Sequence, residues 1–433
     1  MDIDLAVVGG GPVGIEAALE GRRHGLSVAL VAEAPVGGRA TFGSLVPSKV
    51  WLNEAERGRT IAMTELGRMI TERSDLLSRK YRHSLKEAGV TVFSGHARLL
   101  APGRIEVESE TESPRLHAKT VLLATGSEPR FDPDVRPDGV RLLAPRYSKG
   151  LPDYPRSVAV AGGGVTGCEY AFAMSAMGSS VTILANGGQL LPRVDAEIAE
   201  RFAGFLTDMG ISIRYNAKVT AMSASERDVT TRYTADSTLH TDYGFIATGR
   251  RPDMEFETED GPHVARDGLG WVVVDDRFET SIPGVYAAGD LVGPPLTVNR
   301  GLYHARRAVS AAAGREPGKP VAFLTEAVYT DPQVAQLGDV TRLSSSSAGV
   351  RVVRREYSRL VKAHLTGETV GLLKIWVRES DDHIVGASCV GREAAELLSP
   401  LQIAMVHRIS LGELAEVPLA HPTFSELATS LHA

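Results

Sequence analysis

Cysteine is scarce in this chain of 433 residues, which contains only Cys168 and Cys389. Two cysteines so far apart in the sequence exclude a disulfide framework and favour a reducing compartment. Long apolar runs are also missing, and none approaches the roughly 20 residues that a membrane-spanning helix needs. Met1 leads directly into a strand-like run, so we expect no signal peptide. The sequence thus predicts a cytoplasmic protein without a membrane span.

Positive charge is not in excess either, because the formal net charge is -6. A nucleic-acid-binding protein usually carries a basic face, so nucleic acid is not an expected partner. We expect no metal site. The remaining composition is that of a globular protein, with 43% hydrophobic and 23% charged residues. The length is sufficient for two to four domains with cores of their own.

One pattern occurs twice, at an offset of 153 residues. Residues 4–14 read D-L-A-V-V-G-G-G-P-V-G, and residues 157–167 read S-V-A-V-A-G-G-G-V-T-G. The motif glycines are Gly9, Gly11 and Gly14 in the first copy and Gly162, Gly164 and Gly167 in the second. The expected helices that follow are 15–24 and 168–177, and the expected second strands are 27–33 and 180–186. A single GxGxxG is a weak signal, but this whole succession repeated is a strong one.

The repeated pattern is that of a dinucleotide-binding unit. The first glycine allows a tight turn, the second lets a pyrophosphate approach the backbone, and the third lets the helix pack closely on the strand. The free N–H groups and the positive end of the helix then bind the phosphates. We therefore predict an α/β protein with two Rossmann-like dinucleotide-binding domains.

An acidic residue at the end of the second strand of such a unit binds ribose hydroxyls. The first copy has Glu33 there, whereas the second has Asn186, preceded by Ala185. Neither an acid that favours NAD nor an arginine that favours the 2′-phosphate of NADP stands at that position. Arg193 is near enough in sequence to be a phosphate ligand or an ordinary surface arginine. The choice between NAD and NADP stays open.

Further segments extend the pattern over nearly the whole chain. They are V-L-L-A-T-G-S-E-P (121–129), F-I-A-T-G-R-R-P (245–252), T-S-I-P-G-V-Y-A-A-G-D (280–290), V-Y-T-D-P-Q-V-A-Q-L-G (328–338) and A-H-P-T-F-S-E (420–426). Together with the two glycine motifs, they resemble the pyridine nucleotide–disulfide oxidoreductases. That family includes dihydrolipoamide dehydrogenase, glutathione reductase, mercuric reductase and soluble transhydrogenase.

The resemblance implies FAD as the cofactor and NAD(P)H as a substrate. Gly9, Gly11, Gly14 and Glu33 would bind the ADP half of FAD, although Glu33 lies one position beyond the glutamate usual in the family. Thr125 and Gly126 would lie beside FAD. Asp290, after Gly289, would bind the ribityl chain. A helix that begins near Thr297 would direct its positive end at the flavin. Gly162, Gly164 and Gly167 would bind the nicotinamide nucleotide.

One departure from the family changes the expected chemistry. The family has a redox-active pair of cysteines with four residues between them, followed by Pro-Ser-Lys. Here the stretch 37–49 reads G-G-R-A-T-F-G-S-L-V-P-S-K, so Ala40 and Leu45 occupy the cysteine positions. Neither side chain forms a thiolate or a mixed disulfide. Cys168 and Cys389 lie in apolar segments, where we expect them to be buried.

Four charged or titratable residues match catalytic positions of the family. Lys49 and Glu169 would pair near the flavin and the nicotinamide, where they adjust the flavin potential and seat the nicotinamide ring. His421 would come from the partner subunit of a homodimer, with Glu426 orienting its ring. Because there is no dithiol to serve, His421 either protonates another acceptor or is an inherited structural residue.

The expected domains follow the family's order. Residues 1–148 and 253–318 would form the FAD-binding domain, 149–252 the NAD(P)-binding domain, and 321–433 an α+β dimerisation domain. Residues 315–320 read as a turn-rich linker and 344–349 as a flexible loop. A helical region over 51–90 would expose one face.

Three interpretations of function remain. The first is a flavin-dependent NAD(P)H oxidoreductase that passes electrons directly to a small non-disulfide acceptor, such as a quinone. The second is a pyridine nucleotide transhydrogenase, since the missing acid at Asn186 would suit a site that tolerates both nucleotides. The third is a non-catalytic FAD-containing binding or assembly protein. Oxidation of a small biosynthetic substrate is also open.

Overall fold

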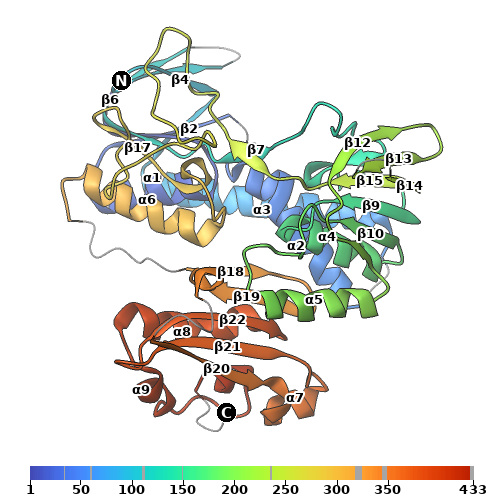
Figure 1. Ribbon diagram of the computed structural model, residues 1–433. Helices are drawn as coiled ribbons and strands as arrows, with labels where there is room; N and C mark the ends of the chain where they lie inside the picture. Colours follow the sequence, from blue (N-terminus) through green and yellow to red (C-terminus); the bar gives the residue numbers. More distant parts are fainter. Residues whose placement is uncertain are drawn as a thin grey trace.

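The computed structural model describes residues 1–33, 35–58, 61–109, 113–148, 150–234, 237–316, 324–343 and 349–429. They fold into three units, which Figure 1 shows as an upper left, an upper right and a lower body. We refer to these as the first dinucleotide unit, the second dinucleotide unit and the C-terminal unit. Together they confirm the predicted fold class of two Rossmann-like units and an α+β unit.

The first dinucleotide unit is built on a mixed sheet with the strand order β3-β2-β1-β6-β5-β4, in which β17 also pairs with β6. The strands are β1 (Asp2–Val8), β2 (Val28–Ala32), β3 (Thr91–Ser94), β4 (His96–Ala101), β5 (Arg104–Glu108), β6 (Arg115–Leu123) and β17 (Val285–Ala287). β3, β2, β1, β6 and β17 run parallel, and their carboxyl ends meet at one edge. Residues that follow β1 and residues that follow β17 are far apart in the sequence, but they lie at this same edge of the sheet.

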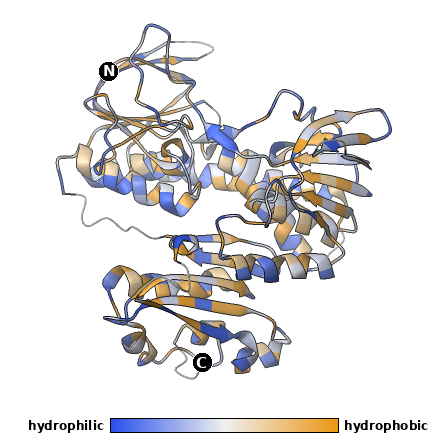
Figure 2. Ribbon diagram, in the orientation of Figure 1, coloured by the Kyte–Doolittle hydropathy of each residue, from blue (hydrophilic) through white to orange (hydrophobic). Residues whose placement is uncertain are grey.

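The helices that the first part of the chain contributes are α1 (Pro12–Arg23), α2 (Leu45–Glu56) and α3 (Met63–Glu87), and α6 (Val298–Ala312) joins them later. α2 packs against α4 (Val165–Ala176) of the second dinucleotide unit. α1 packs against α6 on one face of the sheet. α3 buries Leu66 and Ile70 while its charged residues stay exposed, as expected for the region 51–90. Figure 2 shows the same division into polar and apolar faces on α6.

The second dinucleotide unit repeats the parallel arrangement with the strand order β11-β10-β9-β15-β8. Its strands are β8 (Leu142–Leu143), β9 (Ser157–Ala161), β10 (Ser180–Leu184), β11 (Ser212–Arg214) and β15 (Tyr243–Ile246). The helices are α4 (Val165–Ala176) and α5 (Ala196–Asp208), and an antiparallel sheet adds β12 (Val219–Ala224), β13 (Val229–Tyr233) and β14 (Ser237–Thr241). A two-stranded ribbon of β7 (Ser127–Pro129) and β16 (Arg250–Pro252) connects this unit to the first.

The C-terminal unit is an antiparallel sheet in the order β18-β19-β22-β21-β20. The strands are β18 (Thr325–Val328), β19 (Gln333–Leu337), β20 (Val350–Glu356), β21 (Leu372–Arg378) and β22 (Ile384–Gly391). The helices are α7 (Val361–Thr366), α8 (Ala394–His407) and α9 (Leu411–Ala415). α8 packs on β19 and β22, so one face of the sheet is covered and a separate apolar core forms there.

Short helical turns complete the described chain: a π-helical turn η1 (Ala40–Ser44) and the 3-10 turns η2 (Pro145–Tyr147), η3 (Gly289–Val292), η4 (Val340–Arg342), η5 (Tyr357–Arg359) and η6 (Phe424–Ala428). Both helices that follow the glycine loops begin three residues earlier than predicted, at Pro12 and Val165. The reason is that the third glycine lies inside the first helical turn. Pro12 suits that place because the first helical residue needs no N–H partner.

The expected domain boundaries stay predictions. The β7–β16 ribbon places the crossings between the two dinucleotide units at 127–129 and 250–252. Residue 149, most of the linker at 315–320, the start of the last domain at 321 and the loop at 344–348 lie outside the described residues. In the part of the chain that the structure describes, no helix is long and apolar enough to span a bilayer.

Candidate active site

A cleft of about 910 Å³ lies where the three units meet, and most of the predicted site residues line it. They are Gly9, Gly11, Glu33, Lys49, Thr125, Gly126, Gly164, Glu169, Asp290 and Thr297. Gly14, Gly162, Gly167 and Gly289 support its wall without lining it, while His421 and Glu426 lie elsewhere. The volume is near the upper end of the range for ligand-binding pockets, about 300–1,000 Å³.

The first glycine loop has the geometry that a pyrophosphate requires. Gly9 has a φ of +115°, and a Cβ there would lie 2.3 Å from the carbonyl oxygen of Ala124. A Cβ at Gly14 would lie 1.8 Å from the carbonyl oxygen of Gly9, so helix and strand could not approach as they do. At Gly11 a Cβ would meet nothing within 4 Å among the described residues. Gly11 therefore leaves backbone open to the cleft at the N-terminus of α1, and the loop fits the diphosphate of a dinucleotide.

The second loop repeats this geometry residue for residue. Gly162 has a φ of +121°, and its Cβ would lie 2.3 Å from the carbonyl oxygen of Ala247. A Cβ at Gly167 would lie 2.0 Å from the carbonyl oxygen of Gly162. Gly164, the N-cap of α4, again has nothing within 4 Å of its Cβ position in the described chain. The second unit thus fits a second dinucleotide.

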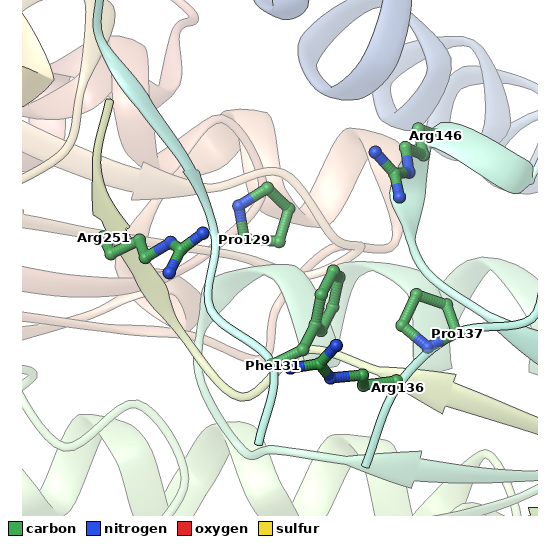
Figure 3. A pocket seen from close by; sticks show the side chains of 6 residues that line it. All are labelled: Pro129, Phe131, Arg136, Pro137, Arg146 and Arg251. Atoms are coloured by element: carbon green, nitrogen blue, oxygen red, sulfur yellow. The ribbon is translucent and has the colours of Figure 1, made fainter. Parts of the chain in front are cut away.

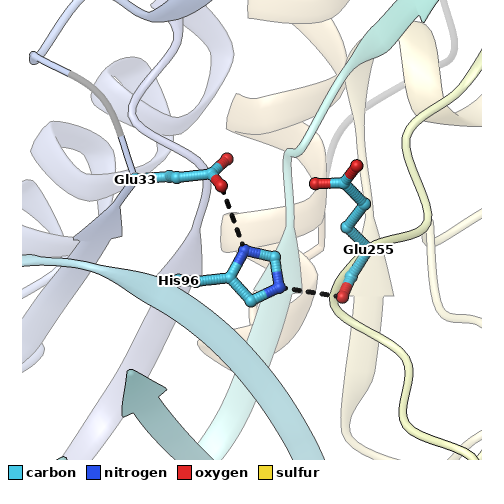
Figure 4. A group of neighbouring side chains, drawn as sticks. All are labelled: Glu33, His96 and Glu255. Carbon is cyan, nitrogen blue, oxygen red and sulfur yellow. Dashed lines mark hydrogen bonds and ion pairs between the residues drawn. The ribbon is translucent and has the colours of Figure 1, made fainter. Parts of the chain in front are cut away.

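Glu33 follows β2 and lies at the edge of the cleft, where Figure 4 shows it facing His96. The Nδ1 atom of His96 lies 3.3 Å from Oε1 of Glu33, and its Nε2 lies 3.0 Å from the carbonyl oxygen of Glu255. The ligand atoms of the three side chains lie within 4.8 Å of one another, close enough for a cation. All three residues line the cofactor cleft, where Glu33 is the predicted ribose ligand, so we assign no metal there.

Asp290 is held by a chain of hydrogen bonds from the β7–β16 ribbon. Ser127 Oγ donates to Asp290 Oδ2 at 2.6 Å, and Arg250 Nε donates to Ser127 Oγ at 2.7 Å. Burial lowers the pKa of Arg250, and the negative charge of Asp290 partly offsets that lowering. The other carboxylate oxygen of Asp290 has no hydrogen-bond donor from the described residues, so it is free to accept a hydroxyl.

The loop after the first unit's glycines is tied down by Arg39. Its guanidinium forms an ion pair with the buried carboxylate of Asp253, the residue that directly follows β16 of the β7–β16 ribbon. Thr125 Oγ1 donates to the carbonyl oxygen of the same Asp253 at 2.7 Å. These bonds fix the backbone on two sides of the cleft, so both sides hold their shape around a long ligand.

The N-terminus of α6 opens onto the same cleft. Thr297 is its N-cap residue, and its Oγ1 atom is buried without a hydrogen-bond partner in the described chain. A buried hydroxyl costs free energy when it is unpaired. Its position in the cleft makes it a ready partner for a polar ligand atom, and the helix end adds a partial positive charge.

Lys49 and Glu169 bring the two dinucleotide units together inside the cleft. Lys49 Nζ of α2 lies 2.7 Å from Oε1 of Glu169 of α4, and the Glu169 side chain is 5% exposed. The C-terminal unit adds Tyr329, whose backbone N–H donates to the same Oε1 at 3.0 Å. The Tyr329 ring lies 4.5 Å from Lys49 Nζ, in cation–π range. All three units thus contact one partly buried ion pair.

Ala40 and Leu45 lie one π-helical turn apart at the start of α2. The backbone N–H of Leu45 bonds to the carbonyl oxygen of Ala40, and both side chains line the cleft. Leu45 is 38% exposed. Pro145 of η2, a turn that contacts η1, also lines the cleft, so these three residues make an apolar part of its wall.

The family description "Pyridine nucleotide-disulphide oxidoreductase" matches residues 3–312, and its dimerisation domain matches residues 324–431. The chain belongs to this family. A dihydrolipoyl dehydrogenase of Chlorobaculum tepidum is 30% identical over 98% of this chain and 95% of its own length. A soluble pyridine nucleotide transhydrogenase of Marinobacter nauticus is 26% identical over 98% and 96%. The crystal structure of LpdA from Mycobacterium tuberculosis, 25% identical, covers 98% of both chains with a TM-score of 0.93.

Membership of the pyridine nucleotide–disulphide oxidoreductases confirms several predictions. The protein uses FAD with NAD(P)H as its substrate, and its family is one of flavin-dependent oxidoreductases, which supports an enzyme. The matched dimerisation domain supports a homodimer. The cytoplasmic location and the roles of the individual site residues stay predictions.

The two cysteines of this family member lie outside the cleft lining. Cys168 and Cys389 are both completely buried, in different apolar cores. Burial raises the pKa of Cys389 to about 12 and also raises that of Cys168 well above its ordinary value. Thiolates are disfavoured at both positions, so neither cysteine is placed to exchange electrons with a flavin.

The His421–Glu426 pair is formed within the C-terminal unit. His421 Nδ1 lies 2.8 Å from Glu426 Oε1, and the backbone N–H of Thr423 donates to Oε2 at 2.8 Å. Burial raises the pKa of Glu426, but these bonds outweigh it and leave that pKa lowered. His421 is 61% exposed in the single chain and does not line the cleft of its own subunit. This is the arrangement expected if the ring serves the partner subunit's cleft.

Sequence reasoning missed several residues that shape the cleft: Arg39, Ser127, Arg250, Asp253, Tyr329 and His96. Arg39 stands between Gly38 and Ala40, and the motifs quoted above contain Ser127, Arg250 and Tyr329, so these four residues carried a local signal. His96 carried none, because its partner Glu33 is 63 residues away in the sequence. Arg193, left open above, pairs with Glu326 of β18 at 2.7 Å beside the cleft.

Proposed function

We propose that this protein passes electrons from NAD(P)H through FAD directly to a small non-disulfide acceptor, such as a quinone. The observation that carries the proposal is the apolar pair of Ala40 and Leu45 in the cleft, where relatives would need thiols. Neither side chain can accept electrons. The acceptor must therefore approach the cofactor itself.

The reductive half of the reaction is supported by Lys49 and Glu169. Bound FAD would take a hydride from the nicotinamide and release the electrons to an acceptor. The ion pair would hold one edge of the ring site, and the cation–π contact with Tyr329 would help to position Lys49. Positioning of reactants is a main source of rate in such transfers. Gly162, Gly164 and Gly167 would bind the diphosphate of the nucleotide.

The oxidative half is supported by the shape of the wall. Ala40 is small, and Leu45 presents an exposed apolar side chain. A flat and weakly polar molecule would therefore bind there favourably, because both it and Leu45 would remove apolar surface from water. A quinone also needs protons. His421 of the second subunit would supply one, with Glu426 holding the ring through Nδ1 so that the other nitrogen faces outward.

Steady-state turnover with different acceptors tests this proposal. We expect NAD(P)H oxidation with 1,4-naphthoquinone and none with oxidised lipoamide or oxidised glutathione. Leu45→Asn should lower kcat/KM for the quinone by about tenfold through loss of apolar contact. The matched control Leu76→Asn, at an exposed leucine of α3, should leave turnover unchanged. Rapid turnover of either disulfide would refute the proposal.

Transhydrogenation between nucleotides is the second candidate. It is favoured by Asn186, which is exposed and brings no carboxylate to repel a 2′-phosphate. Arg214 lies next to it, because the carbonyl oxygen of Arg214 accepts the N–H of Ala185 at 2.9 Å. Turnover with NADPH and a thionicotinamide analogue of NAD, in the absence of quinone, would favour this second candidate.

A further inference from the structure

A second cavity, of about 300 Å³, opens beside the cofactor cleft. Figure 3 shows its lining, which consists of Pro129, Phe131, Arg136, Pro137, Arg146 and Arg251. We call it the arginine cavity. Pro129 also lines the cofactor cleft, but the arginines and Phe131 do not. The cavity is therefore a neighbour of the active site rather than part of it.

Tertiary structure gathers this lining from distant segments. Pro129 ends β7 and Arg251 lies in β16, so the ribbon between the two dinucleotide units forms one side. Arg146 lies in η2, and Arg136 comes from the segment that leads to β8. None of these arginines belongs to a sequence motif of the glycine loops. Their meeting at one cavity is a property of the fold.

The positive charge of the cavity is incompletely neutralised. Arg251 pairs with Glu128 at 2.7 Å. The guanidinium of Arg146 lies over the ring of Tyr147 at 4.7 Å, and Arg136 has no polar partner in the described chain. The neighbouring Asp138 is engaged elsewhere, because its Oδ1 accepts the backbone N–H groups of residues 140–142. Two guanidiniums thus face the cavity without a carboxylate from the described residues.

Such an arrangement favours an anion. Arg136 and Arg146 are exposed, so water weakens their field, but two positive charges at one cavity still attract a negative group. The planar fork of arginine matches the oxygens of phosphate and carboxylate groups. The rest of the lining is apolar, and Figure 3 shows the Phe131 ring between Pro129 and Pro137. A flat ring would find a stacking surface there.

We propose that the arginine cavity binds a small aromatic anion, namely one flat ring that carries a phosphate or carboxylate group. The anionic group contacts Arg136 and Arg146, and the ring packs on Phe131. The volume of about 300 Å³ is at the small end of ligand sites and suits a ligand of this size. This site does not depend on the identity of the electron acceptor.

Isothermal titration calorimetry of the FAD-loaded protein, in about 50 mM salt to limit screening, tests the proposal. The probes are phenyl phosphate, benzoate, inorganic phosphate and phenol. We expect phenyl phosphate or benzoate to bind once per chain, at least about tenfold more tightly than phosphate or phenol. The tighter of the two ring anions identifies the charged group. These probes lack a nucleoside and so discriminate against the dinucleotide sites.

Variants locate the binding. Arg136→Gln with Arg146→Gln should weaken the ring anion at least about tenfold, while the matched surface control Arg79→Gln on α3 should not. Phe131→Leu should bring the ring anion close to the affinity of inorganic phosphate. An unchanged flavin spectrum shows that each variant is folded. No binding of either ring anion, equal binding of ring anion and phosphate, or full affinity in the double arginine variant would overturn the proposal.

Discussion

The Nζ atom of Lys49 lies 2.7 Å from Oε1 of Glu169, although the two residues come from different dinucleotide units. The pair is partly buried, with Glu169 buried and Lys49 about one-third exposed, and Tyr329 of the C-terminal unit adds a third contact inside the cofactor cleft. Under the proposed function, this pair would position the nicotinamide ring against the flavin. Its presence together with Ala40 and Leu45 is what the proposed function expects of a protein that keeps the nucleotide half-reaction.

Removing this pair should slow reduction of the flavin by NAD(P)H. We expect Lys49→Met or Glu169→Gln to lower the reduction rate by about tenfold to 100-fold, because the nicotinamide loses its fixed edge. Anaerobic rapid mixing measures that rate. Lys119→Met, which removes the exposed pair with Asp4, is the matched control and should reduce at the parent rate. A parent-like rate in both Lys49 and Glu169 variants would make the pair purely structural.

The absence of a dithiol should appear in a reductive titration. The parent should take up one two-electron equivalent per FAD and show no thiolate-to-flavin charge-transfer absorbance, because Ala40 and Leu45 cannot store electrons. Ala40→Cys with Leu45→Cys restores the spacing of the family and should take up a second equivalent. A second equivalent in the parent would contradict the assignment.

Replacing His421 should separate the two half-reactions. His421→Ala is expected to leave flavin reduction unchanged and to slow reoxidation by a quinone by about 100-fold, within the range of general acid catalysis. The variant must remain dimeric, which light scattering checks, and exposed His83→Ala serves as the control. Reoxidation at the parent rate would leave His421 with a structural role alone.

The contact between α5 and the C-terminal unit should weaken in acid. The hydrogen bond from Arg354, with help from Lys374, lowers the pKa of Glu197 from 4.5 to about 2, although burial opposes it. Because the folded pKa is the lower one, the pair stabilises fully above about pH 4.5. That contribution is lost as the pH falls towards 2.

Glu197→Gln should therefore lower the free energy of unfolding near pH 7 by about 1 kcal/mol or less, since the pair is partly exposed. The unfolding temperature should fall accordingly. The difference from the parent should shrink towards pH 3. Thermal unfolding at both pH values measures it, with exposed Glu72→Gln on α3 as the control. A difference that grows in acid would show that the sign is wrong.

The glycine loops could be predicted from the sequence because each glycine meets a local steric demand. Gly9 and Gly162 have φ values near +120°, and Gly14 and Gly167 leave no room for a Cβ. These demands fall at fixed positions of the motif, so the spacing of the glycines alone predicts them. The departure at Ala40 and Leu45 was equally visible, since it depends on residue identity alone.

The support around these residues was not predictable in the same way. Arg39 bonds to Asp253, 214 residues away in the sequence, and Ser127 bonds to Asp290, 163 residues away. Ser127 lies in β7 and Asp253 directly follows β16, so the pairing of these two strands helps to bring the partners together. The arginine cavity arises from that same ribbon. Contacts of this kind depend on how the units pack, and no local periodicity encodes them.

Under the proposed function, reduced flavin gives its electrons directly to a non-disulfide acceptor. The most direct test is a double-mixing experiment, in which anaerobic protein is first reduced with one equivalent of NAD(P)H and then mixed with an acceptor. The account predicts rapid flavin reoxidation by 1,4-naphthoquinone and none by oxidised lipoamide or glutathione on the same timescale. Rapid reoxidation by a disulfide, with the quinone inert, would contradict it.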